Sequence, residues 1–378
     1  MNQDMNQDGQ VHQAHSHAQV ASLNNQRLTS IDALRGLTVA AMLLVNNAGD
    51  WNYVYLWLSH SSWHGASPAD FIFPFFLVIV GVSLYLALTP KFEQGLSARQ
   101  LAPTIIWRAC KIFALGVVLH LVAVALIPDR QFRLMGVLQR IGLCFLVAGL
   151  LFIYLRSLKQ LWYLIFAILL SYWYLLASAG SYQAHLNLVD QIDTRVLGSL
   201  AYHFDLQSGL AQEPEGILST VSAIVSVLLG IQAGAILRRG QASNLLLLGL
   251  VMCACAYLWS FVLPINKHLW TSSFVLWTTG FAYLIIWLMH QLIDRLKLPA
   301  IGLSFGVNAI AAYAGSWVAT CVLAGTGWMD KIYGGLFVPI FTPINNPYLT
   351  SLAFAIVFTA TFAVLMLILR KIGWRFSV

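Results

Sequence analysis

HSSWHGASPADFIFPFF, residues 60–76, is a polar loop rich in histidine and tryptophan that runs directly into an apolar helix. Histidine has the side-chain pKa closest to neutrality, so it can exchange a proton or carry an acyl group at physiological pH. A lone histidine near a membrane interface is more often a hydrogen-bonded anchor than a catalyst. His60 and His64 lie close to Trp63 and Asp70, and this clustering favours chemistry over simple anchoring.

The composition around this stretch indicates a polytopic membrane protein. Of the 378 residues, 59% are hydrophobic and 9% are charged, and the mean hydropathy is +0.75, unlike a soluble domain. The net charge of +7 does not indicate a nucleic-acid partner, because the basic residues form short clusters between apolar runs. The five cysteines lie inside apolar segments and lack the spacing of a zinc site or a disulfide framework.

The N-terminal segment differs from the rest of the chain. Residues 1–26 are rich in Gln, Asn and His, and we expect a disordered tail because such a segment cannot bury enough apolar surface to fold. His12, His15 and His17 lie in this tail without a folded scaffold, and we predict no metal site. The first apolar run begins after Ser30 and suits a retained span better than a signal peptide. Residues 27–378 are predicted to form one membrane domain.

Apolar segments of the length that a spanning helix needs, about 20 residues, recur along this domain. They lie at about 31–49, 70–88, 106–126, 136–155, 160–179, 216–237, 243–263, 269–291, 304–323 and 350–369. We therefore predict an all-α polytopic membrane protein with about ten transmembrane helices and both termini on one side of the membrane.

The distribution of basic residues predicts the orientation. If the N-terminus, the even-numbered connections and the C-terminus are cytoplasmic, only six of the 21 basic residues fall on the opposite side: Arg130, Arg133, Arg140, Arg195, Lys267 and Lys331. Since Lys and Arg accumulate on the cytoplasmic side, both termini are expected there. The His60 loop is then extracytoplasmic, together with two long loops, 180–215 and 324–349.

Ionisable residues inside spanning helices are costly, so each invites a functional explanation. Asp32 and Arg35 are three residues apart on one helical face and can pair, either as a structural salt bridge or as part of a phosphate site. Arg140, at the start of the fourth span, should face the bundle interior and offer its planar fork to an anion or to Asp70. Asp70 also suits the N-terminus of the second span through the helix dipole.

Two more polar clusters lie beside predicted outer helix ends. Glu215 precedes the sixth span, and Asn266, Lys267 and Trp270 precede the eighth. Carboxylates, amides and aromatic faces are the groups that sugar sites use, so these residues are candidates for substrate binding. Helix capping and the aromatic belt of the membrane interface are the structural alternatives.

Six sequence blocks, taken in order, resemble the heparan-α-glucosaminide N-acetyltransferase family of transmembrane acyltransferases, in its bacterial NagX-type form. The similarity extends over about residues 27–370, and the blocks are RLTSIDALRG (27–36), VN (45–46), HSSWHGASPADFIFP (60–74), GVLQRIG (136–142), PEGIL (214–218) and NKHLW (266–270).

This resemblance implies transfer of an acetyl group from cytoplasmic acetyl-CoA to the amine of glucosamine, or of a glucosamine-terminated saccharide, on the far side of the membrane. The active-site histidine of the family falls on His60, and the asparagine of the second block falls on Asn46. His64 stands where the animal members have asparagine, so it should not inherit the catalytic role and is expected to line the acceptor pocket with Trp63.

The residues fit this chemistry. His60 can act as general base or acetyl carrier, and Asn46 and Trp63 can donate N–H groups to the oxyanion. Candidates for binding the coenzyme, chiefly its phosphates, are the basic residues Arg35, Arg140, Arg238 and Arg239. We expect the protein in the bacterial inner membrane, without a metal cofactor, and as a homodimer, the commonest symmetric assembly.

Two alternatives remain open. A permease for N-acetylglucosamine or a related amino sugar would use a similar many-helix bundle with a polar outer pocket, and it would accumulate sugar in vesicles without acetyl-CoA. An acyltransferase with another donor or acceptor would share the pocket and differ only in its substrates.

Overall fold

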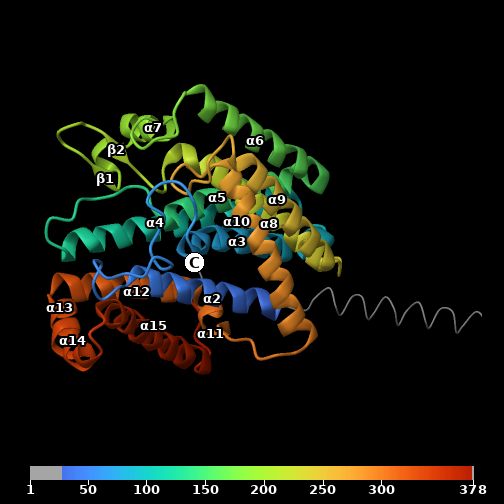
Figure 1. The fold of residues 1–378 in the computed structure, drawn as a ribbon. Coiled ribbons are helices and arrows are strands. Elements are labelled where there is room, and N and C mark those ends of the chain that lie inside the picture. The colour runs from blue at the N-terminus through green and yellow to red at the C-terminus, as the bar shows by residue number, and fades with distance from the viewer. Residues whose placement is uncertain (1–27, 377–378) are drawn as a thin grey trace, which may run out of the picture.

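The computed structural model describes residues 28–376, which fold into a bundle of helices with one very short β-hairpin (Figure 1). The tail predicted for residues 1–26 lies outside the described residues. In order, the elements are α2 (Thr29–Asn46), η1 (Pro68–Phe71), α3 (Ile72–Glu93), α4 (Ala98–Leu126), α5 (Val137–Leu155), α6 (Leu158–Ser178), α7 (Leu188–Val196), η2 (Gly198–Leu200), β1 (His203–Phe204), β2 (Ala211–Gln212), α8 (Ile217–Arg238), α9 (Ser243–Ser260), α10 (Ser272–Met289), η3 (His290–Arg295), α11 (Leu303–Val307), α12 (Ala309–Gly325), α13 (Trp328–Ile332), η4 (Tyr333–Phe337), α14 (Val338–Phe341), η5 (Thr342–Ile344) and α15 (Pro347–Lys371).

The predicted all-α membrane fold is confirmed, although the span count differs from ten. Within residues 28–376, eight helices are long and apolar enough to cross a membrane, and up to nine if α12 and the segment Trp328–Ile344, bent by 85°, form one broken span. α2 has 18 residues but is not among the eight. Asp32 and Arg35 make this helix less apolar than its neighbours.

Several predicted boundaries change for identifiable local reasons. α4 begins at Ala98, well before the predicted residue 106, because Ser97 and Gln100 form a capping box at its start. The ninth predicted segment breaks at Asn308, whose side chain donates to Trp374 O (3.2 Å) and accepts from Phe376 N (3.1 Å). The predicted loop 324–349 is largely helical, as α13, η4, α14 and η5.

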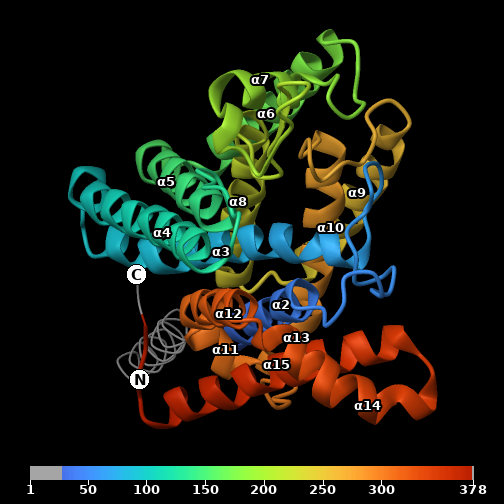
Figure 2. The same cartoon turned by 90° about the vertical axis from the view of Figure 1, so that its left-hand side faces the viewer.

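The helices form two groups that lie against each other. Figures 1 and 2 show α2, α11, α12 and α15 on one side and α3, α4, α5, α8, α9 and α10 on the other. Within the second group α3 packs along α8, α4 along α5 and α9 along α10, while α2 packs against α11 in the first. Consecutive long helices from α3 to α10 run in opposite directions. Residues distant in sequence meet at each end of the bundle as a result.

Two glycines allow close contact between α3 and α8. A Cβ atom on Gly81 would lie 2.0 Å from Val227 O, and one on Gly230 would lie 2.1 Å from Val78 O. The obstructing atoms belong to the backbone, so they cannot move aside as a flexible side chain would. Small residues of this kind let membrane helices pack closely.

We expect Gly81→Ala to destabilise the protein by about 1–3 kcal/mol, because the added methyl group must separate α3 from α8. The measurement is the thermal unfolding midpoint of the purified protein. Gly334→Ala is the matched control, since a Cβ at Gly334 meets no atom within 4 Å. Equal midpoints for the two variants would contradict the proposed close packing.

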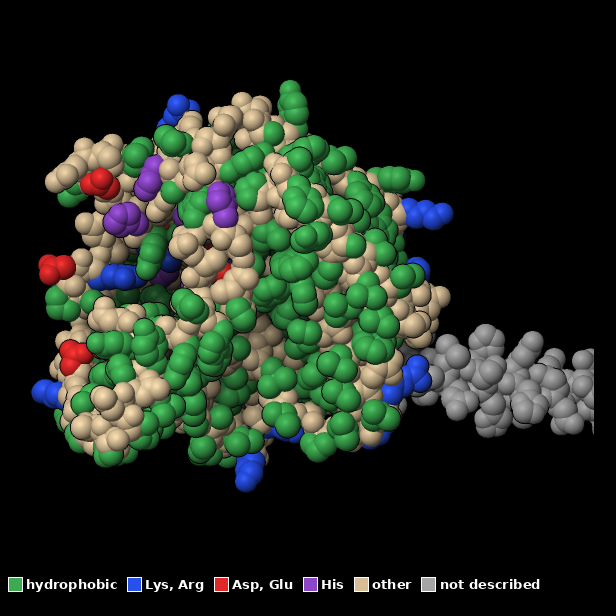
Figure 3. Space-filling model, in the orientation of Figure 1, with side chains coloured by type: hydrophobic (Ala, Val, Ile, Leu, Met, Phe, Trp, Pro, Cys, Tyr) green, Lys and Arg blue, Asp and Glu red, His purple; other side chains and the backbone are tan. Residues whose placement is uncertain are grey.

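The alternating helices define two ends of the bundle. We call one the histidine end, made of the connections 47–67, 127–136, 179–216 and 261–271. We call the other the basic end, made of the connections 94–97, 156–157, 239–242 and 296–302. Figure 3 shows histidine side chains gathered around a hollow near β1 and β2 on the left of the molecule, with Lys or Arg side chains inside the hollow.

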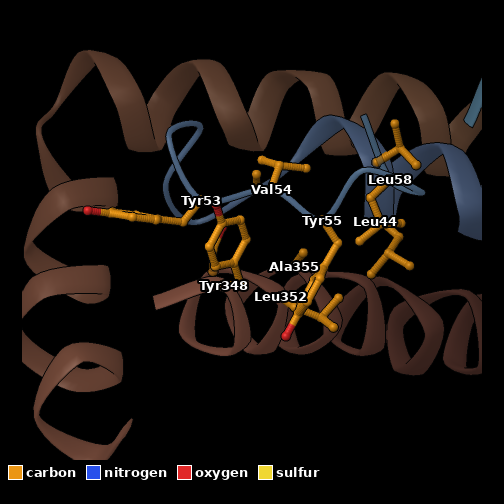
Figure 4. A pocket seen from close by; sticks show the side chains of 11 residues that line it. Leu44, Tyr53, Val54, Tyr55, Leu58, Tyr348, Leu352 and Ala355 are labelled. Carbon is orange, nitrogen blue, oxygen red and sulfur yellow. The ribbon is translucent and has the colours of Figure 1, made fainter. Parts of the chain in front are cut away.

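The segment that leads to His60 is anchored on α15. Gly49 N donates to Ser351 O (3.3 Å), and Asp50 N donates to Ser351 Oγ (3.0 Å). The ring centroids of Tyr53 and Tyr55 lie 5.6 and 5.5 Å from that of Tyr348. Figure 4 shows these rings and the neighbouring aliphatic side chains around a small cavity. The volume of this cavity is only about 10 Å³. This tight packing joins the loop to α15 and to the end of α2, both in the first helix group.

Candidate active site

The geometry of the His60 loop follows from a helix cap. The sequence Ser67-Pro-Ala-Asp70 places Ser67 at the N-cap of η1, proline at the first helical position and Asp70 at the third, which is the pattern of a capping box. Asp70 Oδ2 accepts hydrogen bonds from Ser67 N (3.0 Å), Ser67 Oγ (3.1 Å), Ser61 N (3.0 Å) and Ser61 Oγ (2.9 Å). These bonds fix the carboxylate, which is fully buried.

The other oxygen of Asp70 meets two charged or titratable groups. Asp70 Oδ1 lies 2.8 Å from His60 Nδ1 and 3.2 Å from Lys267 Nζ, and Lys267 Nζ lies 3.1 Å from His60 Nδ1. The His60 side chain is 48% exposed, so a substrate can reach it. A buried carboxylate that holds an accessible imidazole is the arrangement by which enzymes orient a general base or nucleophile.

Lys267 reaches this pair because its loop is fastened to the His60 loop. Gly65 N donates to Ile265 O (2.7 Å), and Gly65 has φ +98°, a conformation that favours glycine. Asn266 is fully buried, donates through Nδ2 to Trp63 O (2.9 Å) and accepts through Oδ1 from Leu269 N (2.8 Å). Asn266, predicted to bind substrate, thus holds the two loops together.

Burial lowers the pKa of Lys267, while the carboxylates of Asp70 and Glu215 oppose that shift. The amine lies between Asp70, which neutralises it, and the open side of His60. A cation in this position is suited to stabilise negative charge that develops on a substrate carbonyl oxygen.

A second Asp–His pair lies behind Trp63. His268 Nε2 is 3.0 Å from Asp190 Oδ1, and the ring centroids of His268 and Trp63 are 5.1 Å apart. Burial alone would raise the pKa of Asp190, but the hydrogen bond with His268 and bonds from His185 and Asn187 leave it below its ordinary value. Trp63 Nε1 donates to Tyr182 O (2.9 Å), so its N–H is engaged with the protein.

His64 lies beside the same connection. Its Nδ1 is 3.3 Å from Asn266 Nδ2, and burial lowers the pKa of its imidazole. No contact within residues 28–376 joins His64 to Asp70. The structure therefore separates the two histidines, because only His60 is paired with the buried carboxylate.

Glu215 belongs to a buried ion cluster with Arg133 and Glu213. Arg133 donates to Glu213 Oε2 through Nε (3.0 Å) and forms ion pairs with both Glu213 and Glu215. Burial raises the pKa of Glu213 despite Arg133. For Glu215, burial acts in the same direction, but Arg133, Arg140 and Lys267 leave the pKa below its ordinary value. Glu215 thus links Lys267 electrostatically to the two arginines.

Arg140 and Trp270 are buried and pack against each other. The guanidinium carbon of Arg140 lies 5.0 Å from the ring centroid of Trp270, a cation–π distance, and Nη2 donates to Gly216 O (3.1 Å) and to Ser219 Oγ. Nε and Nη1 have no hydrogen-bond partner within the described part of the chain. Trp270 is 1% exposed, so its ring is a buried support and offers no open face to a sugar.

The remaining candidates lie elsewhere. Asn46 is exposed and lines a cavity of about 50 Å³ with Tyr313, Trp317 and Thr320, and no contact joins it to His60 among the described residues. Arg140 lies at the histidine end with Gly216, away from the other predicted coenzyme residues. The separation arises because α5, like α3, begins at the histidine end, and Arg140 lies in the first turn of α5.

Those other residues lie toward the basic end. The predicted pairing of Arg35 with Asp32 is confirmed at 2.9 Å, and Arg35 Nη2 also donates to Ser83 Oγ (2.7 Å). Arg238 forms an ion pair with Glu93 (2.6 Å). Arg239 lines a separate cavity of about 400 Å³. Within residues 28–376 no group of three or more His, Cys, Asp or Glu side chains could hold a metal ion.

Asp193, on α7, is a titratable group that the sequence does not single out. Its Oδ1 accepts from Ile217 N (2.9 Å) at the start of α8, and Oδ2 has no hydrogen-bond partner in the described part of the chain. Burial raises the pKa of Asp193 to about 6. The cap of α8 is therefore sensitive to pH near neutrality.

We expect Asp193→Asn to change how stability depends on pH. Between about pH 4 and 6 the folded protein holds a proton on Asp193 that the unfolded chain has released, so this group's contribution to the free energy of unfolding falls as pH rises through that range, by at most about 3 kcal/mol. The asparagine variant lacks this contribution. The advantage of the wild type over the variant should shrink from pH 4 to 6 and then level off, as measured by thermal unfolding midpoints. The exposed residue Asp330 supplies the control, Asp330→Asn; a constant difference for Asp193→Asn would contradict the shifted pKa.

Known proteins match this chain over the same site. Residues 27–203 match the family model described as heparan-alpha-glucosaminide N-acetyltransferase, catalytic. The match contains His60, Trp63 and Asp70, whereas Glu215 and Lys267 lie beyond it.

Two curated relatives extend the similarity. The heparan-alpha-glucosaminide N-acetyltransferase of Mus musculus is 29% identical over 355 residues, covering 76% of this chain and 53% of the mouse protein. The Homo sapiens protein of the same name is 28% identical over 355 residues, covering 76% of this chain and 52% of the human protein. The chain thus spans about half the length of the curated relatives that it matches. By the family match and these two similarities, the chain resembles the heparan-alpha-glucosaminide N-acetyltransferase family over the part that carries His60 and Asp70.

Proposed function

We propose that this protein is a transmembrane acetyltransferase that moves an acetyl group from acetyl-CoA to the amine of glucosamine or of a glucosamine-terminated saccharide. The observation that carries the proposal is the cluster of His60, Asp70 and Lys267, in which a buried carboxylate holds an accessible imidazole beside an amine. The similarity to the heparan-alpha-glucosaminide N-acetyltransferase family supports the reaction class.

The reaction forms an amide bond and breaks a thioester. The amine nitrogen attacks the acetyl carbonyl carbon, the carbon–sulfur bond breaks, and the proton that leaves the amine is balanced by the one taken up by the CoA thiolate. With Nδ1 of His60 donating to Asp70, Nε2 is the basic nitrogen that accepts the amine proton. Lys267 stabilises the oxyanion of the tetrahedral intermediate.

The same groups also support a two-step route. Nε2 of His60 would attack the thioester and release CoA thiolate, and the amine of the sugar would then take the acetyl group from the imidazole. Asp70 orients the ring in both routes. Incubating the protein with labelled acetyl-CoA alone distinguishes them, because only the two-step route leaves label on the protein.

The proposed orientation places the histidine end outside the cytoplasm and the basic end inside it. The distribution of Lys and Arg supports this orientation. Acetyl-CoA would then enter from the basic end, where Arg35 and Arg238 lie, and the sugar would reach His60 from the other side. We propose the bacterial inner membrane as the location.

The test is release of free CoA by the purified full chain with acetyl-CoA and a panel of amino sugars. We expect glucosamine to stimulate release and N-acetylglucosamine, which has no free amine, to fail. Sugar uptake into protein-containing vesicles without acetyl-CoA, with no CoA release in the assay, would instead identify a permease and overturn the proposal.

A further inference from the structure

A cavity at the basic end is distinct from the His60 site. It has a volume of about 400 Å³, and its walls come from the end of α3, the turn between α5 and α6 and the end of α8. Aromatic side chains, Tyr85, Phe92 and Phe152, form one part of its lining, and basic side chains, Arg156, Lys159 and Arg239, form another. No acidic residue lines it.

The three basic side chains carry unbalanced charge. Arg238, the immediate neighbour of Arg239, is neutralised by Glu93 at 2.6 Å. Arg156, Lys159 and Arg239 form no ion pair within residues 28–376. Three cations around one cavity repel one another, and an anion between them would remove that repulsion.

Part of this arrangement is held in place before any ligand binds. Arg156 ends α5 with φ +54°, and its guanidinium carbon lies 4.9 Å from the ring centroid of Phe92. Phe152 in turn contacts Phe92 and Tyr85, with centroid distances of 6.0 and 5.5 Å. The ring of Phe92, held by Phe152 and Tyr85, therefore packs against the guanidinium of Arg156 and keeps it beside the cavity.

We propose that this cavity binds the phosphate headgroup of an anionic phospholipid. Its volume is in the range of ordinary ligand sites, about 300–1,000 Å³. Arginine binds phosphate through paired charge-assisted hydrogen bonds, and the aromatic wall suits the apolar part of a lipid just below its headgroup. Basic pockets between the ends of membrane helices are typical sites for anionic lipids. The proposal does not rest on the acetyl-transfer reaction.

The first test measures lipid retention by the purified full chain with native mass spectrometry. Phosphatidylglycerol is added, with phosphatidylcholine as the zwitterionic comparison. We expect the wild type to retain phosphatidylglycerol at least 10-fold better than the double variant Arg156→Gln/Lys159→Gln. The double variant Arg295→Gln/Lys297→Gln, which removes two exposed charges elsewhere at the basic end, should behave as the wild type does. Equal retention by all three proteins, or equal retention of phosphatidylcholine, would overturn the proposal.

The second test separates a lipid from a soluble phosphate ligand. Inorganic phosphate and CoA, each at millimolar concentration, are added to the complex of wild type and phosphatidylglycerol, and the lipid is expected to stay bound. Displacement by CoA or by phosphate would assign the cavity to a soluble phosphate compound and overturn the lipid assignment. Since the readout is bound lipid mass, failure here differs from failure of CoA release in the acetyltransferase assay.

Discussion

His60→Ala is expected to lower acetyl transfer by about 10²–10⁴-fold, the range over which a positioned general acid–base group contributes. Without the imidazole, the amine of the sugar has no acceptor for its proton, and no acetyl carrier remains. The His60 side chain is 48% exposed, so its removal leaves no buried cavity and the protein should stay folded. The measurement is the rate of CoA release with acetyl-CoA and glucosamine, beside the thermal unfolding midpoint.

His64→Ala is the matched control for this variant. It removes the neighbouring imidazole of the same loop, which has no carboxylate partner among the described residues, and we expect less than a 10-fold loss with the change mainly in KM for the sugar. Unchanged turnover in His60→Ala, or a larger loss in His64→Ala, would contradict the assignment of His60.

Much of the fold could be predicted because lipid imposes a simple rule on the sequence. Apolar runs of spanning length mark the helices directly, and each of the ten predicted segments overlaps a helix of the structure. The errors arise where local polar groups act. Ser97 and Gln100 extend α4 toward its N-terminus, and Asn308 breaks the ninth segment by bonding residues near the C-terminus.

The segment 324–349 differs most from its prediction as a loop. Its glycine, proline and asparagine residues are typical of a loop, yet the structure forms short helices bent by 85° from α12. Tertiary contacts stabilise these short helices, since Phe354 of α15 packs against Tyr333 and Phe337. No short-range sequence signal encodes a contact of this kind.

The sequence predicts the two polar segments of the candidate site, but it does not predict that they contact each other. The His60 loop and the segment around Lys267 could each be identified as polar clusters at outer helix ends. The two segments are some 200 residues apart in the chain. Their contact depends on how α3 and α10 pack, and a single sequence does not predict that packing. Arg133 was missed for the same reason, because its partners Glu213 and Glu215 lie far along the chain.

Asp70 shows why two alternatives from the sequence need not exclude each other. The contacts of the helix cap and the contacts with His60 and Lys267 are made by different oxygens of the carboxylate. Oδ2 accepts the bonds of the cap, and Oδ1 faces His60 and Lys267. One carboxylate therefore fixes both the loop and the orientation of the imidazole.

This division predicts the effect of Asp70→Asn. The amide oxygen of asparagine can accept the four bonds from Ser61 and Ser67, so the cap and the fold should persist. The amide nitrogen then faces His60 Nδ1 and Lys267 Nζ, two groups that need an acceptor. We expect the imidazole to turn or to hold its proton on the other nitrogen, and acetyl transfer to fall by about 10²–10⁴-fold, as when an orienting carboxylate is replaced beside a catalytic histidine.

A double-mutant comparison separates this positioning role from a structural one. If Asp70 acts through His60, Asp70→Asn should cost little further activity in a His60→Ala background, because residues that act as one unit are not additive. Lys267→Met should lower activity less than Asp70→Asn, since it removes the oxyanion partner but leaves the imidazole oriented. The measurements are CoA release and thermal unfolding midpoints for the single and double variants. Additive losses in the double variant would show that Asp70 does not act through His60. An unfolding midpoint for Asp70→Asn far below that of His60→Ala would show that Asp70 mainly supports the fold.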